Sequence, residues 1–274
     1  MNRWNLRQKT ALFLLCAFAF LLAITLIGPM LTSRAVETDL TRKNLAPSLS
    51  YLFGTDQLGR DMLSRTLSGL SLSIRIGVLT AAVSAIIALA LGLAAATLGP
   101  KVDAAIGFFI DFLMGIPHIL LLILVSLAFG RGFQGVVAAM SLTHWPSLAR
   151  LLRGEVLQLK NRTYIKAAEK LGLSRWAVAK KHLLPHLLPQ FITGTILLFP
   201  HAILHEASLT FLGFGLSPEQ PAIGVILSES MTYLVTGKWW LSLFPGLMLV
   251  LVVALFSAAG ERLRRLTDPG SIHE

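Results

Sequence analysis

The stretch YIKAAEKLGLSRWAVAKKHLLP, residues 164–185, is basic and has the pattern of two short helices, inside a chain that is otherwise apolar. Gly172 suits the position that ends the first helix, because glycine adopts the left-handed conformation without a Cβ penalty. Ser174 can then cap a second helix, which Pro185 and Pro189 are expected to stop. The pattern therefore predicts a helix-turn-helix.

Small residues leave parts of this helix-turn-helix nearly bare. Ala167, Ala168 and Gly172 carry little or no side chain, so the backbone of another protein could approach closely. A short helix fits into the groove of a partner in this way. The stretch is therefore a candidate docking element.

The composition of the chain is typical of an all-α membrane protein. Its 274 residues are 54% hydrophobic and 14% charged, and their mean hydropathy is +0.70. The apolar residues fall in runs, and a helix of about 20 apolar residues crosses a hydrocarbon core roughly 30 Å thick. Six transmembrane helices are predicted, at residues 11–31, 74–98, 105–129, 132–148, 191–211 and 240–259. The first run is longer than a signal peptide's apolar region and no small-x-small site follows it, which indicates a retained span.

The net charge of +10 lies between the apolar runs rather than on a polar domain. Such basic segments indicate membrane orientation, not nucleic-acid binding. With the N-terminus inside, the inner segments hold about twice as many lysines and arginines as the outer ones, which predicts that both termini are cytoplasmic. The single cysteine, Cys16, excludes a disulfide framework within the chain.

The chain divides into three predicted parts. Residues 1–73 form an N-terminal span and an external polar segment. Residues 74–269 form a core, with a cytoplasmic loop at 149–190 that contains the docking element. Residues 270–274 form a C-terminal tail.

Four motifs in order carry a resemblance to a known family. They are KAAEKLG followed after nine residues by HLLP (166–185), FGTDQLGRD (53–61), EASLTFLGFGLSP (206–218) and FPGLMLVLVVALFSAAGERLRRLTDP (244–269). Together they resemble the membrane subunits of ABC importers of the dipeptide/oligopeptide/nickel family. The resemblance covers residues 53–269 and implies a type I ABC importer permease fold in the bacterial inner membrane.

The resemblance also implies a division of labour between subunits. This chain would form half of a translocation path, beside a second permease subunit, two ATP-binding subunits and an external substrate-binding protein. It contains no G-x-x-x-x-G-K-[ST] phosphate loop, so ATP and Mg²⁺ are expected in the partner subunits, with no cofactor and no enzymatic activity in this chain. A stand-alone secondary transporter is a distant alternative, which leaves the spacing of the docking motif unexplained.

Two sets of residues take expected roles from the motifs. Coupling to the ATPase is expected at the docking motif: Lys166, Ala167, Ala168, Gly172, Leu184 and Pro185. Lys166 stands where the motif has glutamate, which implies a neutral or acidic ATPase surface opposite it. The external motif comprises Gly54, Thr55, Asp56, Gly59, Arg60 and Asp61. Turn chemistry and a local ion pair explain these residue types; the alternative is an external scaffold for a partner.

The fifth span carries the strongest indication of the substrate. His201 and His205 are four residues apart and so share a helix face, and imidazole suits nickel, copper and zinc. The two histidines resemble a His-x-x-x-His pattern at this place in the nickel permeases of the family. Glu206, by contrast, resembles the glutamate found there in the peptide permeases. The alternative for the pair is hydrogen bonding to neighbouring helices.

His118 and His144 lie beside prolines and are interpreted as satisfied polar residues at helix breaks. His201, His205 and Glu206 are the expected residues of the path, with the two histidines as metal ligands. The leading interpretation is a permease subunit for nickel or a related transition metal, free or chelated. The alternative is the same role in a dipeptide or oligopeptide importer.

Overall fold

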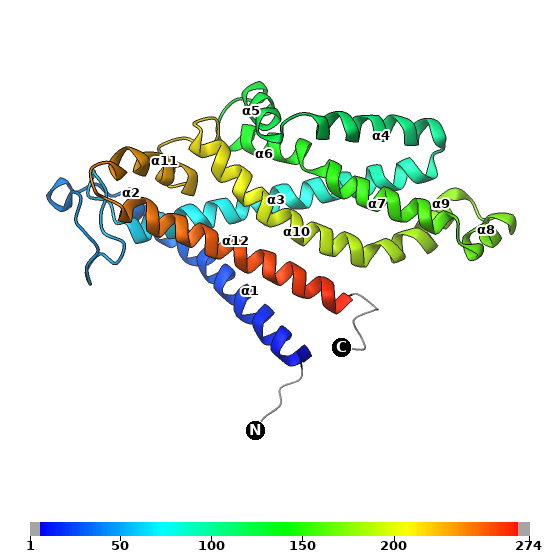
Figure 1. Cartoon of the computed structure of the whole chain (residues 1–274), viewed down its shortest axis with the longest axis horizontal. Coiled ribbons are helices and arrows are strands. Elements are labelled where there is room, and N and C mark those ends of the chain that lie inside the picture. The colour runs from blue at the N-terminus through cyan, green and yellow to red at the C-terminus, as the bar shows by residue number, and fades with distance from the viewer. Residues whose placement is uncertain (1–5, 268–274) are drawn as a thin grey trace.

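The computed structural model describes residues 6–267 as an elongated bundle of helices (Figure 1). Four helices are long: α1 (Leu6–Met30), α3 (Met62–Thr97), α10 (Leu184–Phe211) and α12 (Trp240–Thr267). The shorter elements are α2 (Thr32–Val36), η1 (Leu40–Arg42), α4 (Pro100–Gly115), α5 (His118–Ala128), α6 (Phe133–Thr143), α7 (Trp145–Lys160), α8 (Thr163–Lys170), α9 (Arg175–Val178), η2 (Ala179–Leu183) and α11 (Ile223–Leu234). The all-α prediction is therefore confirmed over these residues.

Within residues 6–267, four helical stretches are long and apolar enough to cross a membrane: Gln8–Met30, Met62–Ala95, Arg175–Phe211 and Trp240–Arg265. They contain or overlap the first, second, fifth and sixth predicted spans. A fifth crossing arises if α4 and α5 are counted as one broken span. The count of six and the side of the termini stay predictions, and the predicted tail at 270–274 lies outside the described residues.

The third and fourth predicted spans are not the continuous helices that the sequence suggested. α4 and α5 meet at 101°, because Pro117 biases Ile116 toward extended backbone, where its ψ is 136°. The fourth span is divided at His144 into α6 and α7. Pro146 follows in the first turn of α7, where its missing N–H group costs no helical hydrogen bond.

Helix α3 runs through the middle of the bundle and packs against α1, α7 and α10. Small residues allow this close approach. A Cβ atom on Gly92 would lie 3.1 Å from the Cβ atom of Leu152 on α7, and one on Gly28 of α1 would lie 2.3 Å from that of Ser71. Membrane helices gain little from burying apolar side chains against one another, because lipid tails are equally apolar. Their interfaces therefore depend on close packing, which small residues allow.

The outer helices present apolar side chains on their free surfaces. Leu15 and Phe18 of α1 are each 67% exposed, as expected of a helix that faces lipid hydrocarbon. The beginning of α1 lies near the end of α12, where the guanidinium of Arg262 stands 3.8 Å from the ring centroid of Phe13. Both helices therefore have one end on the same side of the bundle (Figure 1).

The predicted stop at Pro185 and Pro189 is wrong. α10 begins at Leu184 and continues through both prolines to Phe211. Pro185 occupies the first turn, where no N–H group is needed, and the five-residue π turn η2 joins α9 to α10 directly. Pro189 leaves a carbonyl of the preceding turn without its helical donor, which a long membrane helix tolerates when its neighbours compensate.

Candidate functional site

The docking segment, defined as residues 163–178, projects from one end of the long axis (Figure 1). Its turn has the hydrogen bonds of a Schellman motif: the Leu173 N–H donates to the Ala168 carbonyl at 3.1 Å and the Gly172 N–H to the Glu169 carbonyl at 3.0 Å. Gly172 has a φ of +89°. The Ser174 hydroxyl accepts from the Ala177 N–H at 3.2 Å. The predicted glycine C-cap and serine N-cap are thus confirmed.

One face of α8 holds the docking segment on the bundle and the other is open. Ile165 and Ala168 are buried, whereas Lys166 and Ala167 are exposed. Of the two later motif residues, Leu184 is half-buried and Pro185 is exposed. The motif therefore contributes both to the attachment of the segment and to its free surface.

Two large apolar side chains at the tip of the docking segment were not singled out from the sequence. Leu171 is 82% exposed and Trp176 is 73% exposed. They lie on either side of the turn, at an end of the molecule that is rich in lysine and arginine and therefore unsuited to hydrocarbon. An exposed apolar pair beside polar residues indicates a protein contact.

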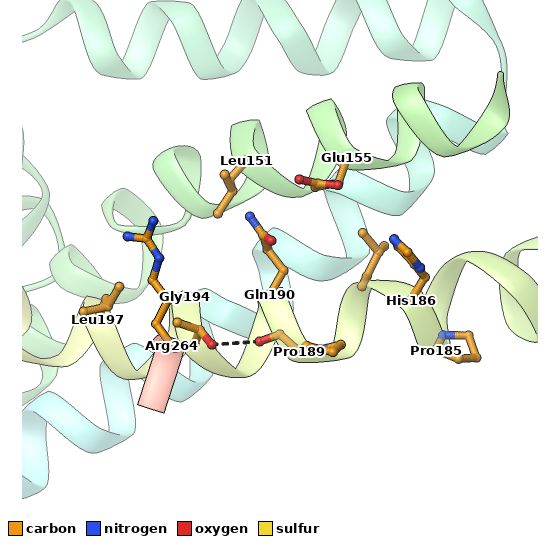
Figure 2. A pocket seen from close by; sticks show the side chains of 11 residues that line it. Leu151, Glu155, Pro185, His186, Pro189, Gln190, Gly194, Leu197 and Arg264 are labelled. Atoms are coloured by element: carbon orange, nitrogen blue, oxygen red, sulfur yellow. Dashed lines mark hydrogen bonds between the residues drawn. The ribbon is translucent and has the colours of Figure 1, made fainter. Parts of the chain in front are cut away.

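A cleft of about 650 Å³ lies next to the docking segment, between α7, α10 and α12. Pro185 and His186 line its near end, and Figure 2 shows Glu155, Gln190 and Arg264 around it. These side chains come from all three helices. The cleft is therefore an opening next to the docking segment that polar and apolar side chains line together.

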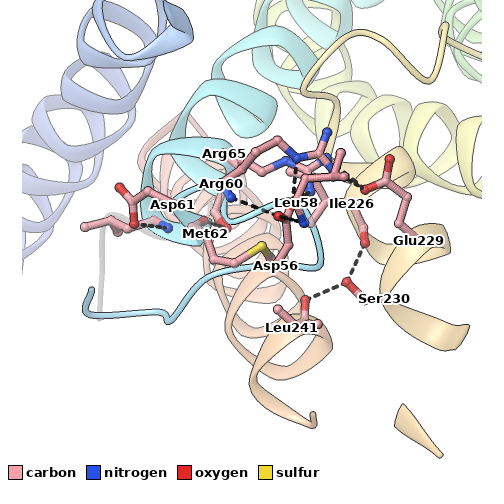
Figure 3. Close-up of polar contacts among 12 residues, drawn as sticks. Asp56, Leu58, Arg60, Asp61, Met62, Arg65, Ile226, Glu229, Ser230 and Leu241 are labelled. Carbon is pink, nitrogen blue, oxygen red and sulfur yellow. Dashed lines mark hydrogen bonds and ion pairs between the residues drawn. The ribbon is translucent and has the colours of Figure 1, made fainter. Parts of the chain in front are cut away.

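The external motif forms a polar network, defined as Asp56, Arg60, Arg65 and Glu229 (Figure 3). It joins the segment before α3 to α11, at the end of the bundle opposite α8 (Figure 1). One Asp56 carboxylate oxygen is 2.6 Å from Arg60 Nε and 2.5 Å from Arg65 Nη1. Both guanidinium groups also reach Glu229 of α11, at 3.0 and 2.9 Å. The network thus ties the motif to α3 and α11.

The other motif residues shape the turn before α3. Asp61 is the N-cap, and its carboxylate accepts from the Leu63 and Ser64 N–H groups at 3.3 Å each. The Thr55 hydroxyl donates to the Arg42 carbonyl and accepts from the Leu45 N–H. These contacts match the interpretation as a capped turn with a local ion pair. The sequence had not indicated Arg65 or Glu229 as members.

Gly59 is required for this turn, because its φ is +75° and a Cβ atom there would lie 1.8 Å from the Asp39 carbonyl oxygen. Gly54 also has a positive φ, +72°. Gly59→Ala should destabilise the protein by about 2–5 kcal/mol, the sum of left-handed strain and steric overlap. Gly237→Ala is the matched control: its φ is +80° with nothing within 4 Å, so only strain of about 1–2 kcal/mol is expected. Thermal unfolding in detergent compares them, and equal losses would contradict the packing argument.

Three histidines from separate elements meet in the bundle and are called the histidine triad: His118, His144 and His205. His118 Nδ1 lies 3.3 Å from His205 Nε2, and His144 Nε2 lies 3.2 Å from His205 Nδ1. One ring nitrogen from each lies within 4.8 Å of the others. His144 is buried, and the other two are half-buried.

The structure places only one of the two histidines that the sequence had paired in the triad. His205 belongs to the triad, but His201, one helical turn earlier, is exposed and lies outside the group of mutually close ring nitrogens. Glu206 is fully buried and accepts a hydrogen bond from the Thr210 hydroxyl at 2.9 Å. His118 and His144 are hydrogen-bonded at helix breaks, as expected. Each contacts His205, His118 also contacts the Thr143 hydroxyl, and His144 also contacts the Met140 carbonyl.

Comparison with known proteins identifies the group to which this architecture belongs. The sequence model of the family described as "Binding-protein-dependent transport system inner membrane component" matches residues 87–273. The dipeptide transport system permease protein DppC of Bacillus subtilis is 33% identical, over 96% of this chain and 82% of that protein. The glutathione transport system permease protein GsiD of Pectobacterium atrosepticum is 34% identical, over 96% and 88%.

A solved structure shares the fold. The MetNI methionine ABC transporter, in an inward-facing conformation, has a chain that superposes with a TM-score of 0.63 at 19% identity, over 76% of this chain and 98% of that one. The resemblance seen in the four motifs is thereby confirmed. This chain belongs to the family of binding-protein-dependent transport system inner membrane components, the multi-pass permease components of ABC transporters.

Proposed function

We propose that this chain is a transmembrane subunit of an ATP-driven importer of dipeptides or oligopeptides, in which it forms half of the translocation path. The observation that carries the proposal is the near full-length similarity to permeases named for dipeptides and glutathione. Those names support the peptide alternative rather than nickel. The histidine triad also does not include His201, one member of the pair on which the nickel interpretation depended.

The proposed assembly contains a second permease subunit, two ATP-binding subunits that hold ATP and Mg²⁺, and an external binding protein. The exposed Leu171 and Trp176 at the tip of the docking segment support contact with an ATP-binding subunit. Lys166, which is exposed on the same segment, would meet a neutral or acidic patch on that subunit, because a like charge at short range is unfavourable.

The connections of the docking segment support a route for mechanical coupling. α7 enters the segment and α10 leaves it, and both helices pack along α3. A displacement of the segment would therefore move two helices of the core together. Rigid-body switching of this kind requires a partner whose contacts differ between the two states, and ATP-driven closure of the ATP-binding subunits would supply it.

Deletion of the gene in its source organism tests the proposed substrate. In a strain without other peptide permeases, deletion should abolish binding-protein-dependent uptake of a labelled dipeptide, and a plasmid copy should restore it. Uptake of labelled nickel should be unchanged, because the proposed cargo is a peptide. Lost nickel uptake with normal dipeptide uptake would overturn the peptide proposal and restore the nickel interpretation.

A further inference from the structure

The histidine triad brings one ring nitrogen from each of three helical elements within 4.8 Å of the others. We propose that His118, His144 and His205 bind one first-row transition-metal ion of the imidazole-preferring class, such as Zn²⁺, Co²⁺, Ni²⁺ or Cu²⁺, as a resident ligand that links three helical elements.

The outward nitrogens of two rings are fixed by oxygen acceptors. His144 Nδ1 lies 2.9 Å from the Met140 carbonyl oxygen, which can only accept, so this nitrogen carries the proton. The Thr143 hydroxyl lies 2.8 Å from the Ala139 carbonyl oxygen and 3.2 Å from His118 Nε2. When the hydroxyl donates to the carbonyl, it accepts from His118 Nε2, and the lone pairs of His118 Nδ1 and His144 Nε2 then both face His205.

With His118 in that tautomer, a neutral His205 cannot satisfy both neighbours. A neutral imidazole has one N–H group, yet each of its nitrogens faces a lone pair, at 3.3 Å from His118 and 3.2 Å from His144. One of the two contacts then joins two lone pairs without a proton between them. A metal ion would bind one nitrogen of His205 together with His118 Nδ1 and His144 Nε2, and so would accept the lone pairs of both neighbours.

The distances fit a metal centre after small ring rotations. Imidazole nitrogens bind zinc at about 2.0–2.1 Å, which in a tetrahedral site separates them by roughly 3.3–3.4 Å. The three candidate nitrogens already lie within 4.8 Å of one another. The oxygen partners of His118 and His144 on the far side of each ring are those that orient metal-binding histidines.

The donor set selects the class of ion. Three imidazoles without a carboxylate suit zinc, copper, nickel and cobalt, whereas Mg²⁺ and Ca²⁺ require oxygen ligands. His118 and His205 are half-buried rather than closed off, which leaves a way in for the ion. Three protein ligands also leave a fourth position for water.

The place of the triad gives the ion a mechanical consequence. His118 begins α5 directly after the 101° bend, His144 precedes α7, and His205 lies on α10. α7 and α10 are the two helices that flank the docking segment. A bound ion would hold together the ends of α7 and α10 that lie away from the docking segment. It would therefore slow any transport step that moves α7 relative to α10; this effect on transport rests on the proposed function.

Binding can be measured without transport. The intact transporter complex in lipid nanodiscs, stripped with a chelator, is titrated with CoCl₂ and followed by visible absorption and metal analysis. We expect one Co²⁺ per copy of this chain with the spectrum of a tetrahedral nitrogen site, displaced by Zn²⁺ and lost in His205→Ala and His144→Ala. His201→Ala is the matched control, because it removes an exposed histidine one turn from the triad and should retain the ion.

A second measurement remains valid if the triad variants do not fold, because it uses only the wild-type complex and His201→Ala. Zn²⁺ should raise the melting temperature of both. Absent Co²⁺ binding in the wild type, or binding that His205→Ala leaves unchanged, would overturn the proposal; the first result would mean that the triad holds a proton only.

The transport effect is tested separately in proteoliposomes. Zn²⁺ should slow dipeptide uptake by the wild type at least several-fold more than uptake by His144→Ala. Equal inhibition would refute the mechanical consequence. Uptake that fails for dipeptides altogether, with Co²⁺ binding intact, would instead refute the proposed substrate.

Discussion

Replacement of both Leu171 and Trp176 with serine should lower the affinity of this permease for its proposed ATP-binding subunits by about 100- to 10,000-fold. Burial of one large apolar side chain contributes about 1.5–3 kcal/mol, and each 1.4 kcal/mol is a factor of about ten in affinity. Both side chains stand free of the bundle, at 82% and 73% exposure. Their removal should therefore leave the fold intact and act on the contact alone.

The measurement is co-purification of the ATP-binding subunits with tagged permease, followed by titration of the detached subunits. Leu49→Ser is the matched control: Leu49 is 98% exposed but lies in the polar segment at the other end of the bundle. It should retain the ATP-binding subunits and their stimulated ATP hydrolysis. Full retention by the Leu171→Ser/Trp176→Ser variant would show that the tip of the docking segment is not the contact.

Features set by neighbours in the sequence were predictable. The glycine C-cap at Gly172 and the serine cap at Ser174 depend on backbone conformation within one turn, so residue type was sufficient. The long apolar helices followed from composition. The proline stop failed because it was also a local argument: the direct connection through η2 places Pro185 in a first turn, where proline is tolerated.

Features that join distant residues could not be obtained in this way. Periodicity relates residues on one helix, so it paired His201 with His205. The neighbours that His205 has in space, His118 and His144, are brought to it by the bend before α5 and the break before α7. Ion pairs between distant residues cannot be predicted from local sequence either. Nothing near Arg65 in the sequence indicates a pair with Glu229, which lies 164 residues later.

The polar network carries the second large expected effect. Asp56→Ala should lower the free energy of unfolding by about 3–5 kcal/mol, the usual loss when one partner of a buried ion pair is removed. The Asp56 and Arg65 side chains are only 2% and 3% exposed, so the Arg65 charge would lose its nearest counter-charge without gaining water. The other Asp56 oxygen also accepts from the Leu58 and Arg60 N–H groups, at 2.9 Å each.

Thermal and denaturant unfolding of the detergent-purified chain measures this loss. Asp39→Ala is the matched control, because its carboxylate pairs with Arg42 at 2.7 Å in the same polar segment but is 28% exposed, and pairs that solvent reaches contribute little. It also loses the cap that its carboxylate forms with Thr41, so a loss of stability is expected, smaller than that of Asp56→Ala.

A double variant separates the weakened ion pair from the lost turn contacts. Asp56→Ala leaves the Arg65 guanidinium with Glu229 alone, at 2.9 Å. Asp56→Ala/Arg65→Met removes that guanidinium and should recover part of the lost stability, because replacement of a whole buried ion pair by apolar groups is often neutral. Glu229 would still pair with Arg60 at 3.0 Å. If the double variant is no more stable than Asp56→Ala, the loss comes from the backbone contacts of Asp56, and the ion pair contributes little to holding the turn on α3.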